Sequence, residues 1–142
     1  MVFEDLKNRI IIKMDNNDDD IYMILDNGDI YRLYHSQDCC ESVYIEDING
    51  DFDDIIGYEI LMAEESMSGI GDSYNSEIEE NCESFTWTFY RLSTMKGDLN
   101  IRFFGSSNGY YSESATFEYV STNEEIALQY FREKKLERIT KN

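Results

Sequence analysis

The sequence contains no proline, and no serine-rich linker separates blocks of different composition. A chain of 142 residues without such a linker is most simply one domain, residues 1–142, with a single hydrophobic core. It also lacks any run of about 18 apolar residues, which argues against a membrane-spanning helix. The N-terminus has no uninterrupted apolar segment of the secretory kind. We therefore expect a cytoplasmic protein.

Residues that carry metal or redox chemistry are few, with three cysteines and one histidine. Such a set is a poor disulfide framework, so reduced thiols are preferred. His35, Cys39 and Cys40 could ligate zinc with Cys82 or an aspartate, but zinc sites usually use separated cysteine pairs. Adjacent strand residues also point to opposite faces. We expect no metal and no cofactor.

Acidic and amide side chains alternate along residues 47–54, which raises the question of a calcium loop. An EF-hand loop needs glycine at its sixth position and glutamate at its twelfth. Counted from Asp47, glycine falls at the fourth position and Tyr58 at the twelfth. The calcium pattern therefore fails.

Catalytic motifs are equally sparse. A nucleophile with a histidine base could only combine His35 with Cys39 or Cys40. Paired carboxylates can transfer protons, but chance pairs are expected among 30 acidic residues. Neither a P-loop nor a GxGxxG motif is present. We expect a protein without enzymatic activity, and a metal-dependent enzyme is the weakest alternative.

Basic residues are missing from the middle of the chain. The 58 residues between Arg32 and Arg91 contain no lysine or arginine and 15 acidic residues. The formal net charge is −18, although the last twenty residues carry +1. Such a field repels nucleic acids and anionic membranes and attracts basic surfaces. The acidic tract favours a basic protein partner, unless it serves only as a solvated face.

Aromatic and β-branched residues, including 11 Tyr and 8 Phe, dominate the rest of the chain. Asn27-Gly28 predicts a hairpin, because both residues accept positive φ. We predict an α+β domain with a mainly antiparallel sheet of six to seven strands, one short helix and a C-terminal amphipathic helix. The candidate strand segments are 9–14, 21–25, 30–34, 42–47, 58–65, 84–95, 99–106 and 110–120.

The last three of these segments are predicted to form an antiparallel meander. Residues 51–56 are predicted to form one helical turn that begins at an aspartate cap and ends at Gly57. Glycine, serine and acidic residues predict a long loop over 66–83. Residues 124–138 predict a helix that is capped by Asn123 and packs on the sheet.

Three blocks are distinctive: DCCESVYIEDINGD, IIGYEILMAEE and TWTFYRLSTMKGDLNIRFFGSSNGYYSESATFE. They resemble an uncharacterised domain family found in tailed-bacteriophage genomes and in some bacterial genomes. The resemblance covers about residues 19–120, so the predicted C-terminal helix lies outside it. It implies no activity and no functional residue. It does imply the cytoplasm of a bacterial host, where small acidic phage proteins often inhibit host enzymes or defence systems.

We therefore predict a phage-type inhibitor of a host defence protein, anti-CRISPR-like, whose acidic surface mimics nucleic acid. Its partner would be a basic host protein that binds nucleic acid, whereas the chain itself would bind neither nucleic acid nor membrane. Its oligomeric state stays open. The residues expected to contact the partner are Asp47, Asp51, Asp53, Asp54, Glu64, Glu65, Glu77, Glu79, Glu80 and Glu83.

The alternative is a small-ligand module that binds a nucleotide signal. In this interpretation Trp87, Tyr110 and Tyr111 would stack on the base, and Arg91 and Arg102 would contact phosphate.

Overall fold

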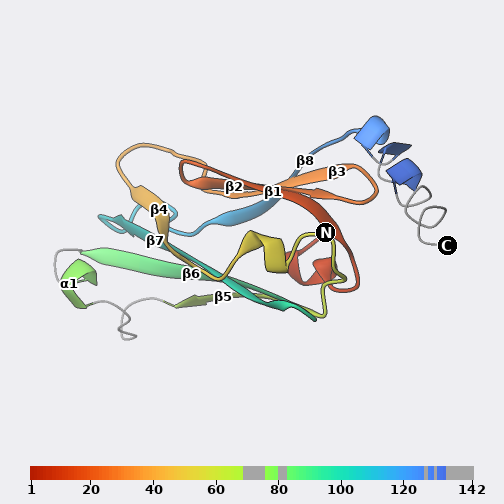
Figure 1. The fold of residues 1–142 in the computed structure, drawn as a ribbon. Helices are drawn as coiled ribbons and strands as arrows, with labels where there is room; N and C mark the ends of the chain where they lie inside the picture. The colour runs from red at the N-terminus through yellow and green to blue at the C-terminus, as the bar shows by residue number, and fades with distance from the viewer. Residues whose placement is uncertain (69–75, 80–82, 127, 130, 134–142) are drawn as a thin grey trace.

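The computed structural model describes residues 1–68, 76–79, 83–126, 128–129 and 131–133, with residues 76 and 77 described in their backbone only. It shows two antiparallel four-stranded sheets that face each other (Figure 1). The first sheet, in the order β1-β2-β3-β8, contains Ile11–Asn17, Asp20–Leu25, Asp29–Tyr34 and Thr116–Thr122. The second, in the order β4-β7-β6-β5, contains Ser42–Asn49, Gly97–Ser107, Ser84–Thr94 and Met62–Ser68. Three short helical segments, η1 (Phe3–Leu6), η2 (Phe52–Asp54) and α1 (Ser76–Glu79), lie outside the sheets. The predicted class, mainly antiparallel α+β, is confirmed, with eight strands instead of six to seven.

The core lies between the sheets because each strand turns alternate side chains inward. In β2, Ile21, Met23 and Leu25 are buried and their neighbours are half-buried. The buried core consists of Phe3, Leu6, Ile11, Met14, Ile21, Met23, Leu25, Tyr31, Leu33, Ile55, Ile60, Ala63, Tyr90, Leu92, Leu99, Ile101, Phe103 and Ala115. Both sheets contribute to this one cluster.

The predicted hairpin at Asn27-Gly28 is confirmed, since β2 pairs with β3. Gly28 has a φ of 89°, whereas Asn27 does not have a positive φ. A Cβ atom on Gly28 would lie 2.2 Å from the carbonyl oxygen of Asn123. Glycine is therefore required both by the turn and by the chain that packs on it.

The outer strands of both sheets are interrupted or covered. Register shifts occur in the pairing of β1 between Ile11 and Lys13, of β4 between Ile45 and Asp47, and of β8 opposite Ile30 and Tyr31. η1 covers β5, where the Glu65 N–H donates to Glu4 Oε2 at 2.6 Å. Such bulges and covers disfavour the addition of a further strand.

The predicted meander of the last three strands is wrong. β6 pairs with β7, but β8 pairs with β3 in the first sheet. The reason is the segment before β8, which packs on the inward side of the second sheet. There the Ala115 N–H donates to Thr88 Oγ1 at 3.2 Å, and the Glu113 backbone lies against Gly105. The strand predicted over 110–120 accordingly begins only at Thr116.

The helical turn predicted over 51–56 is confirmed as η2, followed by Gly57 with a φ of 87°. The Asp51 side chain, however, makes no capping hydrogen bond. Within the predicted loop 66–83, β5 continues to Ser68 and α1 occupies residues 76–79, while 69–75 and 80–82 lie outside the described residues.

The C-terminal helix is present at residues 124–126, 128–129 and 131–133, and residues 134–138 lie outside the described part of the chain. Asn123 caps it, because its Oδ1 accepts the Glu125 N–H at 3.1 Å. In the described turns, the predicted packing on the sheet is not found. Figure 1 shows the described turns leaving the end of β8 away from both sheets, and Leu128 and Phe131 are 56% and 61% exposed. Within the described residues, no helix is long and apolar enough to cross a membrane.

Candidate functional site

The outer face of the second sheet, which points away from the first sheet, carries several of the residues that the sequence marked. Residues directly opposite each other in antiparallel strands point to the same side. The pairing therefore defines three rows across β5, β6, β7 and β4. The rows are Glu64, Arg91, Asn100 and Asn49; then Ser66, Phe89, Arg102 and Asp47; then Ser68, Trp87, Phe104 and Tyr44.

The third row is an aromatic cluster beneath α1. Trp87 is fully buried and meets Phe104 edge-on, with ring centroids 4.6 Å apart. Phe104 also stacks with Tyr44 and Phe85. The Trp87 Nε1–H donates to Glu79 Oε1 at 2.8 Å, which ties α1 to the sheet. Trp87 therefore serves as a packed anchor, and its ring is not exposed for a ligand to stack on.

Both arginines of the outer face are already paired with carboxylates. The Arg102 Nε–H donates to Glu46 Oε2 at 2.5 Å, and a second nitrogen of the same guanidinium also contacts this oxygen. Asp47 Oδ2 lies farther from Arg102, at 3.9 Å. Arg91 pairs with Asp98 at 3.3 Å. A phosphate at this face would have to compete with carboxylates for both guanidinium groups.

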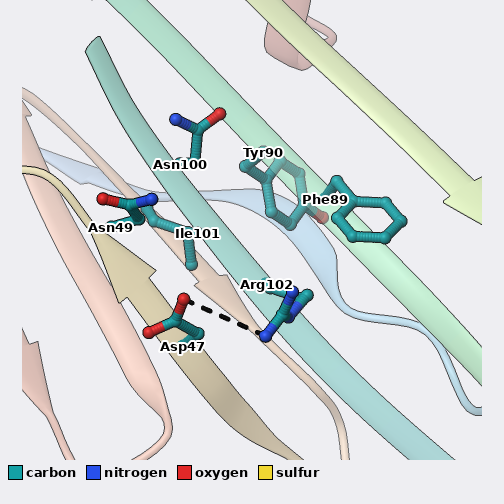
Figure 2. A pocket seen from close by; sticks show the side chains of 7 residues that line it. All are labelled: Asp47, Asn49, Phe89, Tyr90, Asn100, Ile101 and Arg102. Atoms are coloured by element: carbon teal, nitrogen blue, oxygen red, sulfur yellow. Dashed lines mark ion pairs between the residues drawn. The ribbon is translucent and has the colours of Figure 1, made fainter. Parts of the chain in front are cut away.

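Between these rows lies a hollow of about 120 Å³, here called the outer-face hollow (Figure 2). Asn49 and Asn100 are directly opposite each other in β4 and β7, and both are exposed. Asp47 and Arg102 form the next pair on the same face of these strands. The residues lining the outer-face hollow are Asp47, Asn49, Phe89, Tyr90, Asn100, Ile101 and Arg102. The hollow thus combines the carboxylate of Asp47, the guanidinium of Arg102, two amides and the aromatic residues Phe89 and Tyr90.

The acidic residues predicted to contact a partner are spread over the second sheet and both of its ends. Asp47 and Glu64 are exposed on the outer face. Asp51 and Asp53 are exposed beside the turn that joins β6 to β7, and Glu83 is exposed at the opposite end, before β6.

The other predicted contact residues are less accessible or lie outside the described residues. Asp54 and Glu65 are half-buried, and Glu79 is half-buried where it accepts the Trp87 hydrogen bond. Glu80 and the side chain of Glu77 are outside the described residues.

The residues of the nucleotide alternative are only partly brought together. Trp87, Arg91 and Arg102 share the outer face, and the Arg102 guanidinium carbon lies 5.2 Å from the Trp87 ring centroid. Tyr110 and Tyr111 instead lie in the loop after β7, where Tyr110 is 88% exposed and Tyr111 is half-buried. The structure therefore separates the two tyrosines from the two arginines.

His35 belongs to a buried pair that sequence reasoning did not find. Its Nδ1 lies 3.0 Å from the Ser114 carbonyl oxygen, and its Nε2 lies 2.8 Å from Glu41 Oε2. Because both ring nitrogens are engaged, His35 is not positioned as a base for Cys39 or Cys40. The sequence holds no signal for the pair, since a bend of the chain, not a regular period, brings Glu41 back to the ring.

Glu41 organises the connection between β3 and β4. It accepts the backbone N–H groups of Asp38 and Cys39 at 3.0 and 2.9 Å, as well as the contact from His35. Burial alone would raise the pKa of Glu41, but these hydrogen bonds outweigh it and lower the pKa to about 2. The carboxylate is therefore held in its ionised form as a structural acceptor.

Cys39 and Cys40 are exposed in a bend, where a disulfide joins their sulfur atoms. This differs from the reduced thiols and from the opposite-facing strand positions that the sequence led us to expect. The physical reason is local, because residues 39 and 40 are not in a strand. Cys82 lies outside the described residues. In the part of the chain that is described, no three His, Cys, Asp or Glu side chains are grouped to hold a metal ion.

Comparison with known proteins found no matching curated protein and no matching solved structure. A family of domains does match, over residues 4–117, and it is described as a domain of unknown function, DUF7448. The match begins earlier than the 19–120 range expected from the sequence blocks. It contains the whole second sheet and ends within β8, before the C-terminal helix. Since it spans most of the 142 residues, the chain belongs to the DUF7448 family.

Proposed function

We propose that the protein is a non-enzymatic inhibitor whose acidic exterior occupies a basic, nucleic-acid-binding surface of a partner protein. The observation that carries the proposal is the charge balance of the second sheet. Arg91 and Arg102 are each held by a carboxylate. Among the described residues, Asp51, Asp53 and Glu64 are exposed and form no ion pair with a basic side chain. The surface therefore keeps an excess of negative charge.

The rigidity of the scaffold supports the same function. β6 and β7 are 11 residues each, which corresponds to a length of about 36 Å. Carboxylates fixed along such strands lose less conformational freedom on binding than carboxylates of a flexible tail. Interactions of this electrostatic kind weaken with added salt, because ions screen exposed charges beyond about 10 Å at 0.1 M.

The nature of the partner rests on the sequence resemblance. Similarity to domains of tailed bacteriophages favours a defence protein in the cytoplasm of a bacterial host, and anti-CRISPR activity is the specific form that we propose. A defence nuclease guided by RNA holds the duplex of guide RNA and target DNA in a positively charged channel. Such a channel is a surface that an acidic protein can occupy.

The test is affinity capture of a partner from bacterial lysate at low salt, followed by competition against that partner's nucleic acid. The variant Asp51→Asn/Asp53→Asn/Glu64→Gln removes three exposed charges of the second sheet and its flank. The matched control Glu124→Gln/Glu125→Gln/Glu133→Gln removes three exposed charges of the C-terminal helix. We expect the first variant to bind the partner about tenfold more weakly, because each exposed ion pair with the partner contributes up to about 1 kcal/mol. The control variant should lose less than about twofold in affinity. Equal losses in the two variants, or an affinity that does not change with salt, would contradict the proposal.

One observation favours the nucleotide-binding alternative, namely the shared outer face of Trp87, Arg91 and Arg102. A panel of nucleotides tested for thermal stabilisation distinguishes the two functions. A nucleotide that raises the melting temperature, with the rise lost in Arg102→Met, would favour the alternative. A flat response favours the acidic inhibitor.

A further inference from the structure

The outer-face hollow offers hydrogen-bond acceptors on one side and an apolar wall on the other. Asp47 contributes a carboxylate, and Asn49 and Asn100 contribute side-chain amides, each with a carbonyl oxygen able to accept, from opposite positions of two paired strands. Phe89 lines the wall (Figure 2). A ligand that fits must therefore present several donors at its tip and carry an apolar stem.

The charge of the outer-face hollow selects a cation. Glu46 holds the guanidinium of Arg102 through two nitrogens, whereas Asp47 stays 3.9 Å away with its side chain 53% exposed. Two carboxylates thus surround one guanidinium, which leaves one negative charge in excess. The formal net charge of −18 adds a field that repels anions. One singly charged cation would bring the hollow to neutrality.

The volume of the outer-face hollow limits the size of the ligand. About 120 Å³ corresponds to roughly four water molecules at about 30 Å³ each. Pockets for whole small molecules measure about 300–1,000 Å³. The hollow therefore suits the end of one side chain better than a complete nucleotide.

A guanidinium group matches the acceptors better than an ammonium group. It is planar, carries five N–H donors in a fixed fork and is weakly hydrated, while lysine presents a compact and strongly hydrated charge. One edge of the fork can donate to Asp47, and the other can donate to the amide oxygens of Asn49 and Asn100. The methylene groups of an arginine stem can lie along Phe89.

We propose that the outer-face hollow binds an arginine side chain presented by the partner. This assignment rests on the proposed function, since that function supplies a basic protein surface. It adds a defined contact, with Asp47 as the ion-pairing residue and Asn49 and Asn100 as the orienting residues.

The test uses the full chain, labelled with ¹⁵N, and Nα-acetyl-arginine amide as the probe in NMR titrations. Nα-acetyl-citrulline amide is the neutral probe of the same shape. We expect the arginine probe to shift the side-chain amide signals of Asn49 and Asn100 and the citrulline probe to leave them in place. Equal shifts from the two probes, or shifts spread over all exposed carboxylates, would overturn the proposal.

Matched variants locate the contact. Asp47→Asn should weaken binding of the arginine probe about fivefold or more, because an ionised acceptor makes a hydrogen bond roughly twice as strong as a neutral one. Asp53→Asn makes the same charge change outside the hollow and should weaken binding less than about twofold. Asn100→Val keeps the charge and the strand but removes one acceptor, and it should abolish the shift at Asn49. Equal effects of Asp47→Asn and Asp53→Asn would show that only the general field acts, and the hollow would be rejected.

A nona-arginine peptide separates this inference from the proposed function. If the affinity for this peptide falls with salt but is equal in the Asp47→Asn and Asp53→Asn variants, the hollow is rejected and the acidic inhibitor stays supported. Shifts at Asn49 and Asn100 with the single arginine probe, together with no competition for a nucleic-acid-binding protein, would support the hollow and reject the inhibitor.

Discussion

His35 and Glu41 form a buried contact, with 2.8 Å between Nε2 and Oε2, in the connection from β3 to β4. The other ring nitrogen of His35, Nδ1, lies 3.0 Å from the Ser114 carbonyl oxygen. The contact between His35 and Ser114 joins the β3–β4 connection to the segment that leads into β8. It therefore links chain regions that are 79 positions apart.

The first prediction concerns the acid stability that Glu41 provides. Its pKa is about 2 in the folded protein and 4.5 when unperturbed. Between these values the unfolded state binds more protons, so stability is present above pH 4.5 and is lost as the pH falls towards 2. We expect Glu41→Gln to flatten the dependence of unfolding free energy on pH across this window, as measured by denaturant titration. Asp38→Asn, in the same connection, should keep the dependence because it leaves the hydrogen bonds of Glu41 intact. A Glu41→Gln slope equal to that of the wild type would contradict this assignment.

The second prediction concerns the crossing segment that separates β8 from β7. Glu113 anchors it by accepting the hydroxyls of Ser84 and Thr86, and Gly105 lets its backbone approach β7. A Cβ atom on Gly105 would lie 1.8 Å from the Glu113 carbonyl oxygen. We expect Gly105→Ala to lower the unfolding free energy by about 3 kcal/mol, as for other overpacked sites.

Gly97→Ala is the control for the crossing segment. Its Cβ atom would meet only the side chain of Asp54, with Oδ2 nearest at 3.1 Å, and that side chain can move. Its effect should stay within about 1 kcal/mol. Similar losses at Gly105 and Gly97 would show that the tight approach at Gly105 does not constrain the fold.

The elements that the sequence predicted well are those with a local signal. Alternating apolar residues located seven of the eight strands to within a few positions, and Gly28 and Gly57 marked turns where a positive φ is observed. The partition into two sheets has no local signal. It coincides with the close approach of the Glu113 backbone to Gly105, which neither residue reveals alone.

Only the part of the candidate site that lies within a single strand was predictable from the sequence. Period-two alternation places Trp87 and Arg91 on one face, because they are separated by an even number of positions within β6. Their pairing with Arg102 and Asp47 depends on the register between strands, including the shift between Ile45 and Asp47. The outer-face hollow depends on this register, so the sequence alone does not reveal it.

The third prediction compares the two ion pairs of the outer face. Arg102 is 30% exposed and Glu46 16% exposed in their side chains, whereas Arg91 and Asp98 are each 49% exposed. Arg102→Met should lower the unfolding free energy by about 1–2 kcal/mol, because it leaves the Glu46 carboxylate half-buried without its donor. Arg91→Met should cost less than about 1 kcal/mol, as for exposed pairs. Chemical denaturation of both variants measures the difference, and a larger loss for Arg91→Met would refute the ranking.

The fourth prediction concerns the attachment of α1. Trp87 is the only tryptophan and is fully buried, and its Nε1–H donates to Glu79 Oε1 at 2.8 Å. Glu79→Ala would leave a buried donor without this acceptor, which costs about 1–3 kcal/mol. We expect a lower unfolding free energy and a red-shifted, more readily quenched Trp87 emission, because water would reach the indole. Glu83→Ala removes an exposed charge near the start of β6 and should change stability by no more than about 0.5 kcal/mol. If Glu79→Ala left both the emission and its quenching by acrylamide unchanged, the hydrogen bond would not be what keeps α1 over the aromatic row.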